Sequence, residues 1–145
     1  MNKDNYEKKR HIGKYISQLY RKSSVFINKE LAKYGIRSGQ LMFLMDLYLK
    51  DGKNQEEISE RLKIDKATTA RALKKLEEQD FIKRIRDDND KRSNKIYLTD
   101  TSKDLKEEVY GVLDEWNEKI SKSLTREEKE TLANLLEKVC KNINA

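Results

Sequence analysis

The sequence predicts a mainly α-helical fold that carries one small β-hairpin, an α+β arrangement in a chain of 145 residues. Three observations predict this class. Apolar residues recur at spacings of three and four along most of the chain, which is the period of an amphipathic helix. Two short β-like runs, 81–86 and 94–99, enclose the charged, turn-prone segment DDNDKRS. The composition, 40% charged and 36% hydrophobic with no proline, suits long helices with solvated faces.

Positive charge is concentrated in two parts of the chain. Residues 1–34 hold nine Lys or Arg against three Asp or Glu, and residues 61–95 hold twelve against seven. Residues 101–145 are slightly acidic, with eight Lys or Arg against ten Asp or Glu. The whole chain carries a formal net charge of +6. Clustered basic charge favours a polyanionic partner, with nucleic acid first. The alternative, that lysine-rich helices only keep the protein soluble, stays open.

The composition argues against several functional classes. Cys140 is the only cysteine and His11 the only histidine, so neither a disulfide nor a metal centre built on these residues is expected, and no cofactor is predicted. No phosphate-binding glycine loop or catalytic set is visible, so the chain is not expected to be an enzyme. It has no apolar run of membrane-spanning length and no signal-peptide pattern, which predicts a cytoplasmic protein.

Two helices are predicted before the central region. The first spans Tyr6–Tyr34, with an interruption near Ser23 and Ser24 left open, and Gly35 is its expected stop. The second runs from an N-cap at Ser38 to residue 49. This second helix is apolar almost all round, which predicts the centre of the core.

Residues 54–79 predict a helix-turn-helix. Asn54 caps a short third helix, and Asp65 caps a fourth helix that reaches Gln79 after a short connection. On the fourth helix the inner face collects Thr69, Ala72, Leu73 and Leu76; the outer face collects Ala67, Thr68, Ala70, Arg71, Lys74 and Lys75. Small side chains beside basic ones suit a helix that lies deep in a DNA major groove, where alanine and threonine methyls meet thymine methyls.

The two β-like runs after this helix predict a hairpin with a basic tip, so the unit becomes a winged helix-turn-helix. Asp100 or Thr101 should cap a fifth helix, and Thr125 with Glu128 opens a sixth. Their apolar stripes have few partners in a chain of this size, which indicates burial against a second subunit. The predicted parts are residues 1–34 and 101–145 for dimerisation and 35–100 for DNA binding.

The pattern resembles the MarR/SlyA family of transcription regulators. The residues that carry the resemblance are Gln40, Asn54 to Ile58, Asp65 to Thr68, Leu76-Glu77, Phe81 to Arg84, Asp87, Asp90-Lys91-Arg92 and Leu98-Thr99. The chain departs from the family pattern at Ser102, where the family has glycine. It departs again at Thr69, where the family has an apolar β-branched residue and where the hydroxyl needs a partner such as a carbonyl one turn back.

The resemblance implies a triangular homodimer whose first, fifth and sixth helices interleave. Recognition helix 66–79 would lie in the major groove and wing 82–99 in the minor groove of double-stranded DNA. Two-fold symmetry then predicts a pseudo-palindromic operator with half-sites roughly 34–36 Å apart. The family further implies repression, with release by a small phenolic or anionic effector.

Four groups of site residues are predicted from these patterns. Arg92 is expected in the minor groove, aimed by Asp90, although the pair could instead only support the turn. Lys66, Ala67, Thr68, Ala70, Arg71, Lys74 and Lys75 are assigned to the major groove and its phosphates. Ser38, Gln40, Asn54 and Gln55 at helix N-termini, with Arg84 and Lys91, are assigned to the DNA backbone, capping alone being the alternative for Ser38 and Asn54. An effector crevice is predicted from His11, Tyr15, Phe43, Tyr110 and Trp116, aromatics that could equally be core.

Two other interpretations remain at this point. The winged helix could be a protein-interaction or non-specific, chromatin-like DNA-binding module. Cys140 lies beside the last apolar stripe and is interpreted as a packing residue, because oxidant sensing needs a depressed pKa and a resolving thiol.

Overall fold

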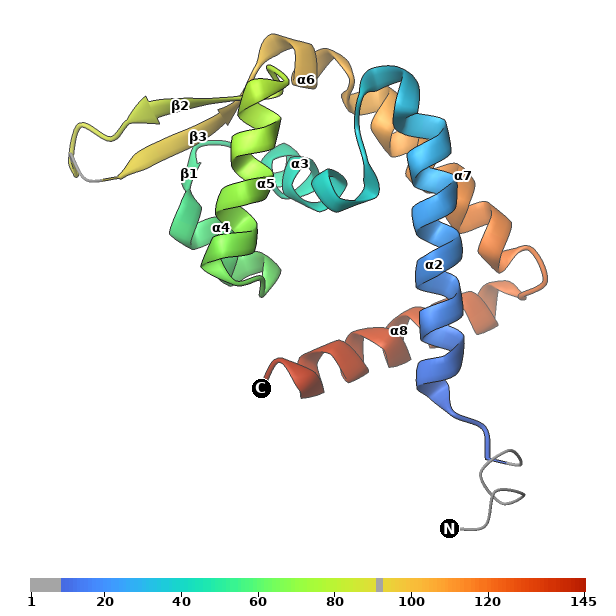
Figure 1. Cartoon of the computed structure of the whole chain (residues 1–145). Helices are drawn as coiled ribbons and strands as arrows, with labels where there is room; N and C mark the ends of the chain where they lie inside the picture. Colours follow the sequence, from blue (N-terminus) through green and yellow to red (C-terminus); the bar gives the residue numbers. More distant parts are fainter. Residues whose placement is uncertain (1–8, 91–92) are drawn as a thin grey trace.

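The computed structural model describes residues 9–90 and 93–145. Its elements, in chain order, are α2 (Ile12–Leu31), the 3-10 turn Ala32–Tyr34, α3 (Ser38–Leu49), β1 (Lys53–Asn54), α4 (Gln55–Leu62), α5 (Lys66–Glu78), β2 (Ile82–Arg86), β3 (Asn94–Leu98), α6 (Asp100–Asp104), α7 (Lys106–Ser121) and α8 (Arg126–Ile143). Residues 38–98 form a winged unit on one side, and α2, α7 and α8 form a helical arm on the other (Figure 1). The predicted mainly α-helical fold with a β-hairpin wing is confirmed.

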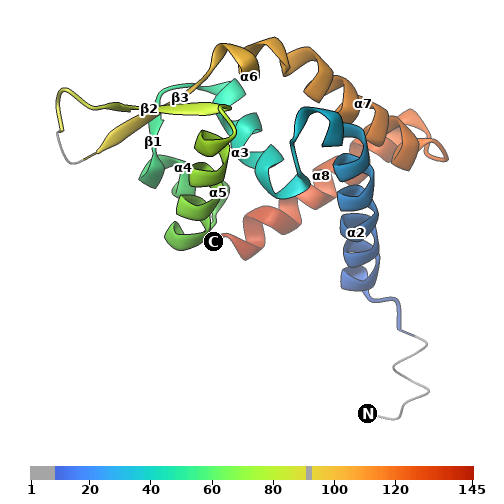
Figure 2. The ribbon, with the colours of Figure 1, turned by 45° about the horizontal axis from the view of Figure 1, so that its top comes forward.

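The wing is part of a three-stranded antiparallel sheet. Its strand order is β1-β3-β2, and the hairpin pairs Ile82 with Leu98 at its base and Arg86 with Asn94 toward its tip. Figures 1 and 2 agree that the hairpin extends away from α2. Strand β1 is only two residues long, too short for a period-2 pattern, and was not predicted from the sequence. Gly52, just before it, has φ of 78° and lies against the Tyr97 ring, so a side chain there would be both strained and crowded.

The core lies where α3 meets the other elements of the winged unit, as its almost entirely apolar sequence predicts. On α3, Phe43 and Leu44 are 2% and 0% exposed. The side chains packed in the same cluster come from α4 (Ile58), α5 (Leu73, Leu76), the wing (Ile82, Ile96), α2 (Ile27, Leu31) and α7 (Val109). The core therefore holds the recognition helix, the wing and the inner ends of α2 and α7 to one centre.

The first helix differs from its prediction. It is continuous through Ser23 and Ser24, because apolar residues on both sides of that pair keep one stripe in phase. Helix α2 begins at Ile12, and the predicted start at Tyr6 lies outside the described residues. Gly35 ends this segment as predicted, with φ of 74° and its N–H donated to the Ala32 carbonyl at 2.9 Å.

Two predicted N-caps are wrong by one or two residues. Ser38 is the first residue of α3, and the capping position is Arg37, whose N–H donates to Gln40 Oε1 at 3.1 Å. Thr99 caps α6 in place of Asp100 or Thr101, because its hydroxyl accepts the Ser102 N–H. Such shifts are ordinary, since several polar residues in a row can each serve as a cap.

The other predicted caps are confirmed. The side chains of Asn54, Asp65 and Thr125 each accept a hydrogen bond from the backbone N–H three residues later. The Glu128 side chain in turn accepts the backbone N–H of Thr125, which completes a capping box. The predicted fifth helix is present but divided at Leu105 into α6 and α7.

A buried charge cluster joins three elements of the winged unit. Lys53 Nζ lies 2.9 Å from Asp46 Oδ2, and Arg61 Nε lies 2.9 Å from Asp46 Oδ1. The side chains of Lys53 and Asp46 are only 2% and 3% exposed. Because β1 pairs with β3 through Lys53 and Ile96, the ion pair of Lys53 with Asp46 fixes the sheet to α3. Arg61 binds the same carboxylate and so adds α4 to the cluster. The sequence analysis did not find this cluster.

The helical arm leaves its apolar stripes uncovered in a single chain. No residue of α8 is buried, and the exposed large apolar side chains are Ile12, Tyr15, Ile16, Leu19, Tyr20 and Val25 on α2, Ile120 on α7, and Leu132, Leu135, Leu136, Val139 and Ile143 on α8. Cys140 is exposed on the same helix. Across residues 9–90 and 93–145, no helix combines the length and apolar character that crossing a membrane requires.

Lys53→Met should lower the free energy of unfolding by about 3 kcal/mol, because it leaves the buried Asp46 carboxylate with Arg61 alone. Urea unfolding followed by circular dichroism measures the change. Lys50→Met removes an exposed lysine nearby and should cost less than about 0.5 kcal/mol. Equal effects of the two substitutions would show that the buried pair is not coupled to folding.

Candidate nucleic-acid interface

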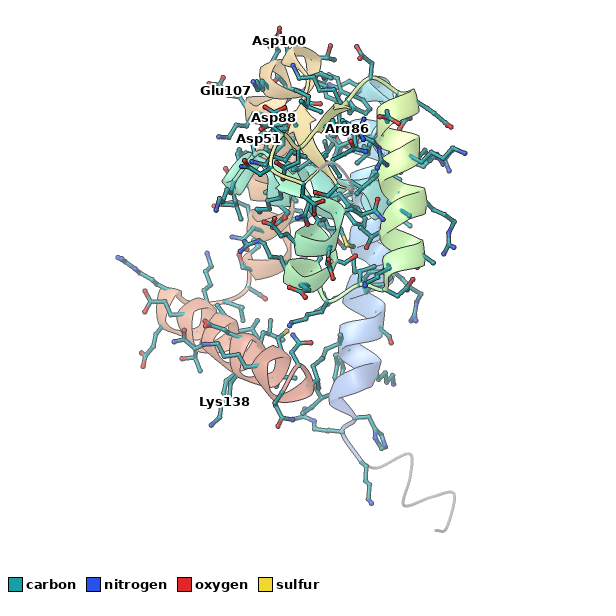
Figure 3. The ribbon with its side chains drawn as sticks, turned by 90° about the vertical axis from the view of Figure 1, so that its left-hand side faces the viewer. Asp51, Arg86, Asp88, Asp100, Glu107 and Lys138 are labelled. Carbon is teal, nitrogen blue, oxygen red and sulfur yellow. The ribbon has the colours of Figure 1, made fainter. Side chains whose placement is uncertain are left out.

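Helix α5 has the two faces that its sequence predicts. Thr69, Leu73 and Leu76 are 0% exposed on the inner face, with Ala72 half-buried beside them. On the outer face Lys66, Ala67, Arg71, Lys74 and Lys75 are exposed, and Thr68 and Ala70 lie at its edges, half-buried. In Figure 3 the labelled acidic residues Asp51, Asp100 and Glu107 lie on the opposite side of the winged unit from α5. The outer face therefore presents basic and small side chains together.

The hydroxyl of Thr69 has the partner that the sequence analysis expected. It donates to the Asp65 carbonyl oxygen one turn back at 2.9 Å. The buried polar atom is thereby satisfied, and its methyl group packs at a position that otherwise suits an apolar residue.

A short chain of hydrogen bonds orders the start of α5. Asp65 Oδ1 accepts the Thr68 N–H, and Asp65 Oδ2 accepts the Thr68 hydroxyl, both at 2.7 Å. Arg71 Nη2 in turn donates to Thr68 Oγ1 at 3.2 Å. The backbone and side-chain hydrogen bonds from Thr68 hold the pKa of the Asp65 carboxyl below its ordinary value, so this cap stays ionised. Arg71 is thus held in place before any ligand arrives.

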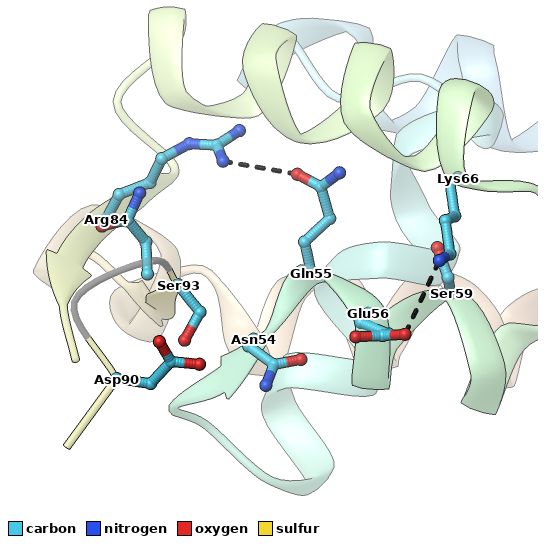
Figure 4. A pocket seen from close by; sticks show the side chains of 9 residues that line it. Asn54, Gln55, Glu56, Ser59, Lys66, Arg84, Asp90 and Ser93 are labelled. Carbon is cyan, nitrogen blue, oxygen red and sulfur yellow. Dashed lines mark hydrogen bonds and ion pairs between the residues drawn. The ribbon is translucent and has the colours of Figure 1, made fainter.

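Five of the predicted DNA-binding residues meet in one polar hollow of about 360 Å³ between α4, α5 and the wing. They are Asn54, Gln55, Lys66, Arg84 and Asp90. Figure 4 shows Arg84 and Gln55 directed at each other, and Lys66 directed at Glu56, 3.6 Å away.

Within this hollow Arg84 has a structural task. Its Nε lies 3.4 Å from Glu77 Oε2 on α5, and its Nη1 donates to Gln55 Oε1 on α4 at 3.4 Å. These contacts tie β2 to both helices of the helix-turn-helix. The guanidinium is therefore already engaged, whereas the sequence analysis treated Arg84 and Gln55 as separate contacts to the DNA backbone.

A second hollow, of about 370 Å³, lies on the other side of α5. It brings Ser38 and Gln40 together with Thr68, Arg71 and Lys75, which the sequence analysis had assigned separately. Arg37 also lines it and is exposed, a basic residue that the sequence analysis missed although it stands directly before a helix start. The first hollow reaches α5 only at Lys66, and the second reaches it at Thr68, Arg71, Ala72 and Lys75.

Gln40, predicted to contact a DNA phosphate, also has a structural role, and its phosphate contact stays a prediction. It is 5% exposed, and its amide is used at both ends: Oε1 accepts the Arg37 N–H, and Nε2 donates to Gln79 Oε1 at 2.5 Å. Gln79 passes the bond on to the Gly35 carbonyl at 3.0 Å. The side chain joins α3 to the end of α5.

The wing tip falls only partly within the described residues. Ser93 N–H donates to the Asp90 carbonyl at 3.1 Å, and Asp87 N–H donates to the Ser93 carbonyl at 3.0 Å. These bonds close the tip, and Asp90 is exposed there. Lys91 and Arg92 lie outside the described residues, so their predicted contacts and the aiming of Arg92 by Asp90 stay predictions.

The five aromatic residues predicted for an effector crevice serve different packing contacts in one chain. Phe43 is 2% exposed in the core, the Tyr110 ring packs on Tyr48 at 5.8 Å, and the Trp116 ring packs on Phe26 at 5.2 Å. Tyr15 is 52% exposed on α2, and His11 is the residue just before that helix. Within one chain Tyr110 therefore packs against α3 and Trp116 against α2, and the effector site stays a prediction.

Comparison with known proteins matches residues 36–94 to the MarR family. The chain is 37% identical over 120 residues to the uncharacterized HTH-type transcriptional regulator YybA of Bacillus subtilis, covering 80% of this chain and 77% of that protein. These proteins are transcriptional regulators rather than enzymes, which agrees with the prediction for this chain.

Two solved structures are similar over nearly the whole chain. A MarR transcriptional regulator from Methanosarcina mazei Go1 is 44% identical, with a TM-score of 0.85 over 90% of this chain and 94% of that one. A putative MarR family regulator from Listeria monocytogenes, complexed with 26mer DNA, is 26% identical, with a TM-score of 0.87 over 94% and 91%.

Asp65→Asn removes the charge of the cap but keeps an oxygen that can accept the Thr68 N–H, since asparagine caps helices about as well as aspartate. The folded-state pKa of Asp65 lies below the unfolded value, so wild-type protein should be the more stable above about pH 4. The difference should shrink as the pH falls through the folded pKa. Urea unfolding of both proteins between pH 7 and strongly acidic pH measures it, and a difference that did not change with pH would contradict the role of the charge.

Proposed function

This chain belongs to the MarR family of transcriptional regulators, and we propose that it acts as a homodimer that binds a pseudo-palindromic operator in double-stranded DNA. In this proposal α5 enters the major groove and the wing reaches the neighbouring minor groove. By occupying a promoter the dimer acts as a repressor, because bound protein excludes polymerase without any further contact.

The outer face of α5 is the observation that carries the proposal. Ala67 and Ala70 are small enough to let the helix approach base edges in a groove about 12 Å wide. Arg71, Lys74 and Lys75 stand beside them, exposed, and supply contacts to guanine or phosphate. The two hollows include residues at the N-termini of α3 and α4, and the start of a helix favours phosphate oxygens.

The wing supports a second groove contact. Each strand of the hairpin has five residues, and at about 3.3 Å per residue the tip extends roughly 16 Å from the base of the sheet. Arg92 stands in this tip segment, and an arginine suits the focused negative potential of a narrow minor groove. We assign Arg92 to that groove and Lys91 to the adjacent backbone.

The uncovered stripes of the helical arm support the homodimer. Exposed apolar patches of this extent mark an interaction surface in soluble proteins. The N-terminal 34 residues are strongly basic and residues 101–145 are acidic, so a second copy offers a surface of complementary charge as well as an apolar one. Release by a small aromatic or anionic effector, with His11, Tyr15, Phe43, Tyr110 and Trp116 as the assigned residues, rests on the family alone.

Arg92→Ala should weaken operator binding by about tenfold or more, because it removes the minor-groove contact. A gel-shift titration on the DNA upstream of the protein's own gene, with and without non-specific competitor, measures it. Arg126→Ala removes a 95% exposed arginine on α8 and should leave affinity unchanged. If the protein binds the non-specific competitor as well as it binds the operator, sequence-specific recognition is contradicted and a non-specific, chromatin-like module is favoured.

Leu135→Asp should convert the dimer into a monomer, because it places a carboxylate in the centre of the uncovered α8 stripe. Analytical ultracentrifugation measures the mass, and operator affinity should fall with it, since only one recognition helix remains. Asn134→Asp adds the same group at the neighbouring exposed position and is expected to stay dimeric. A wild-type protein that sediments as a monomer would overturn the dimer.

A further inference from the structure

The winged unit and the helical arm meet at a polar and aromatic contact centred on Tyr48. The Tyr48 hydroxyl, at the end of α3, donates to the Ser102 carbonyl of α6 at 2.6 Å. Its ring lies 5.8 Å from the Tyr110 ring of α7. Lys106 Nζ stands over both rings, 5.9 Å from the Tyr48 centroid and 5.6 Å from the Tyr110 centroid. One side chain of the winged unit therefore contacts two successive helices.

The chain is divided between those two helices. Helix α6 ends at Asp104, α7 starts at Lys106, and Leu105 between them stays in the right-handed helical region but with ψ of −5°, well above the usual helical value of about −42°. Two side-chain bonds fasten the start of α6 to the winged unit: Thr99 Oγ1 donates to the Asp80 carbonyl at 2.7 Å, and Ser102 Oγ donates to the Phe81 carbonyl. Helix α6 is thus fastened to the winged unit, and α7 runs from the shared core, where Val109 is buried, out into the arm.

This division makes the break at Leu105 a joint, and Tyr48 bridges it. A change of angle between α6 and α7 must either break the bond to Ser102 or separate the two rings. The ribbon views place α6 between the winged unit and α7 (Figures 1 and 2).

A small rotation at the joint has a large effect at the DNA. Helix α5 is about 20 Å long, and a rotation of about 10° moves a point 20 Å away by roughly 3.5 Å. That displacement equals about one base-pair step. In a dimer such a displacement changes the separation of the two recognition helices enough to favour a different half-site spacing.

We propose that Tyr48, held by Ser102, Tyr110 and Lys106, is the specificity-determining joint that sets which half-site spacing the dimer accepts. This inference rests on the proposed function, because it requires two recognition helices on paired half-sites. Tyr48 acts through the angle of the winged unit and touches no DNA, so it is a positioning residue.

The chemistry of the bond suits a fixed joint. Burial, followed by the neighbouring Tyr110 and Glu108, raises the pKa of Tyr48 to about 12, so its hydroxyl remains a donor at any pH at which the protein works. The charged groups closest to the pair, Lys106 and Glu108, both come from the first turns of α7. The acceptor is a backbone carbonyl and cannot rotate away without moving α6.

The test compares operators that differ only in half-site spacing. The operator is first selected with wild-type protein from random DNA, and duplexes with one base pair removed or added at the centre are then prepared, together with a single half-site. Tyr48→Phe keeps the ring stack and removes only the hydroxyl. Its preference for the selected spacing over the altered ones should fall by roughly three- to tenfold, as the loss of one hydrogen bond implies. Affinity for the single half-site should stay within about twofold.

Matched variants separate the joint from general effects. Lys106→Met removes the cation over both rings and should also flatten the spacing preference, whereas Lys119→Met removes a cation 5.0 Å from the Phe26 ring on the same helix and should not. Tyr34→Phe removes a hydroxyl outside the joint and should match wild type. Circular dichroism confirms folding, and Lys106→Met keeps the test decisive if Tyr48→Phe does not fold.

Each outcome decides the inference. A flattened preference with unchanged half-site affinity in Tyr48→Phe supports it. An unchanged preference, or an equal loss on every duplex including the half-site, overturns it and leaves Tyr48 a packing residue. Wild-type protein that selects no paired half-sites refutes the proposed function, and the inference with it, before any variant is measured.

Discussion

The buried ion pair between Lys53 and Asp46 is the constraint on which the winged unit depends. Two charges that are almost fully removed from water must keep their partners, because an unpaired buried charge costs several kcal/mol. Lys53 is also the residue through which β1 pairs with β3, and Arg61 extends the cluster to α4. The sheet, the central helix and the first helix of the helix-turn-helix are therefore fixed to each other at one point.

Other buried polar contacts fix orientation in the same way. Gln40 links α3 to Gln79 at the end of α5, Arg84 links β2 to α5 and α4, and Tyr48 links α3 to α6. The apolar core is non-directional and supplies most of the stability, whereas hydrogen bonds and ion pairs select one angle between elements. A DNA-reading surface needs such fixed angles, because the helix and the wing must match two grooves at once.

The division between the winged unit and the helical arm separates the two surfaces that the proposed function assigns to DNA and to a second subunit. The winged unit satisfies its own core and exposes a basic face. The arm does the reverse: α8 has no buried residue and its stripe is uncovered. Each part therefore points to a different partner, and two covalent connections join the parts: residues 32–37 lead from α2 to α3, and α6 with Leu105 leads from the wing to α7.

The sequence by itself determined what depends on periodicity and local chemistry. The two faces of α5, the hairpin, the caps at Asn54, Asp65 and Thr125, and the carbonyl partner of Thr69 all follow from residues within four positions or from strict alternation. Only the tertiary structure decided contacts between distant positions, such as Asp46 with Lys53 and Arg61, Gln40 with Gln79, or Tyr48 with Ser102. The shift of the cap to Thr99 and the burial of Gln40 also depend on tertiary structure. Each side chain bonds a residue that packing brings close: Thr99 bonds the Asp80 carbonyl and Gln40 bonds Gln79. Periodicity shows which face of a helix or strand is buried, but it does not show which residue of another element packs against that face.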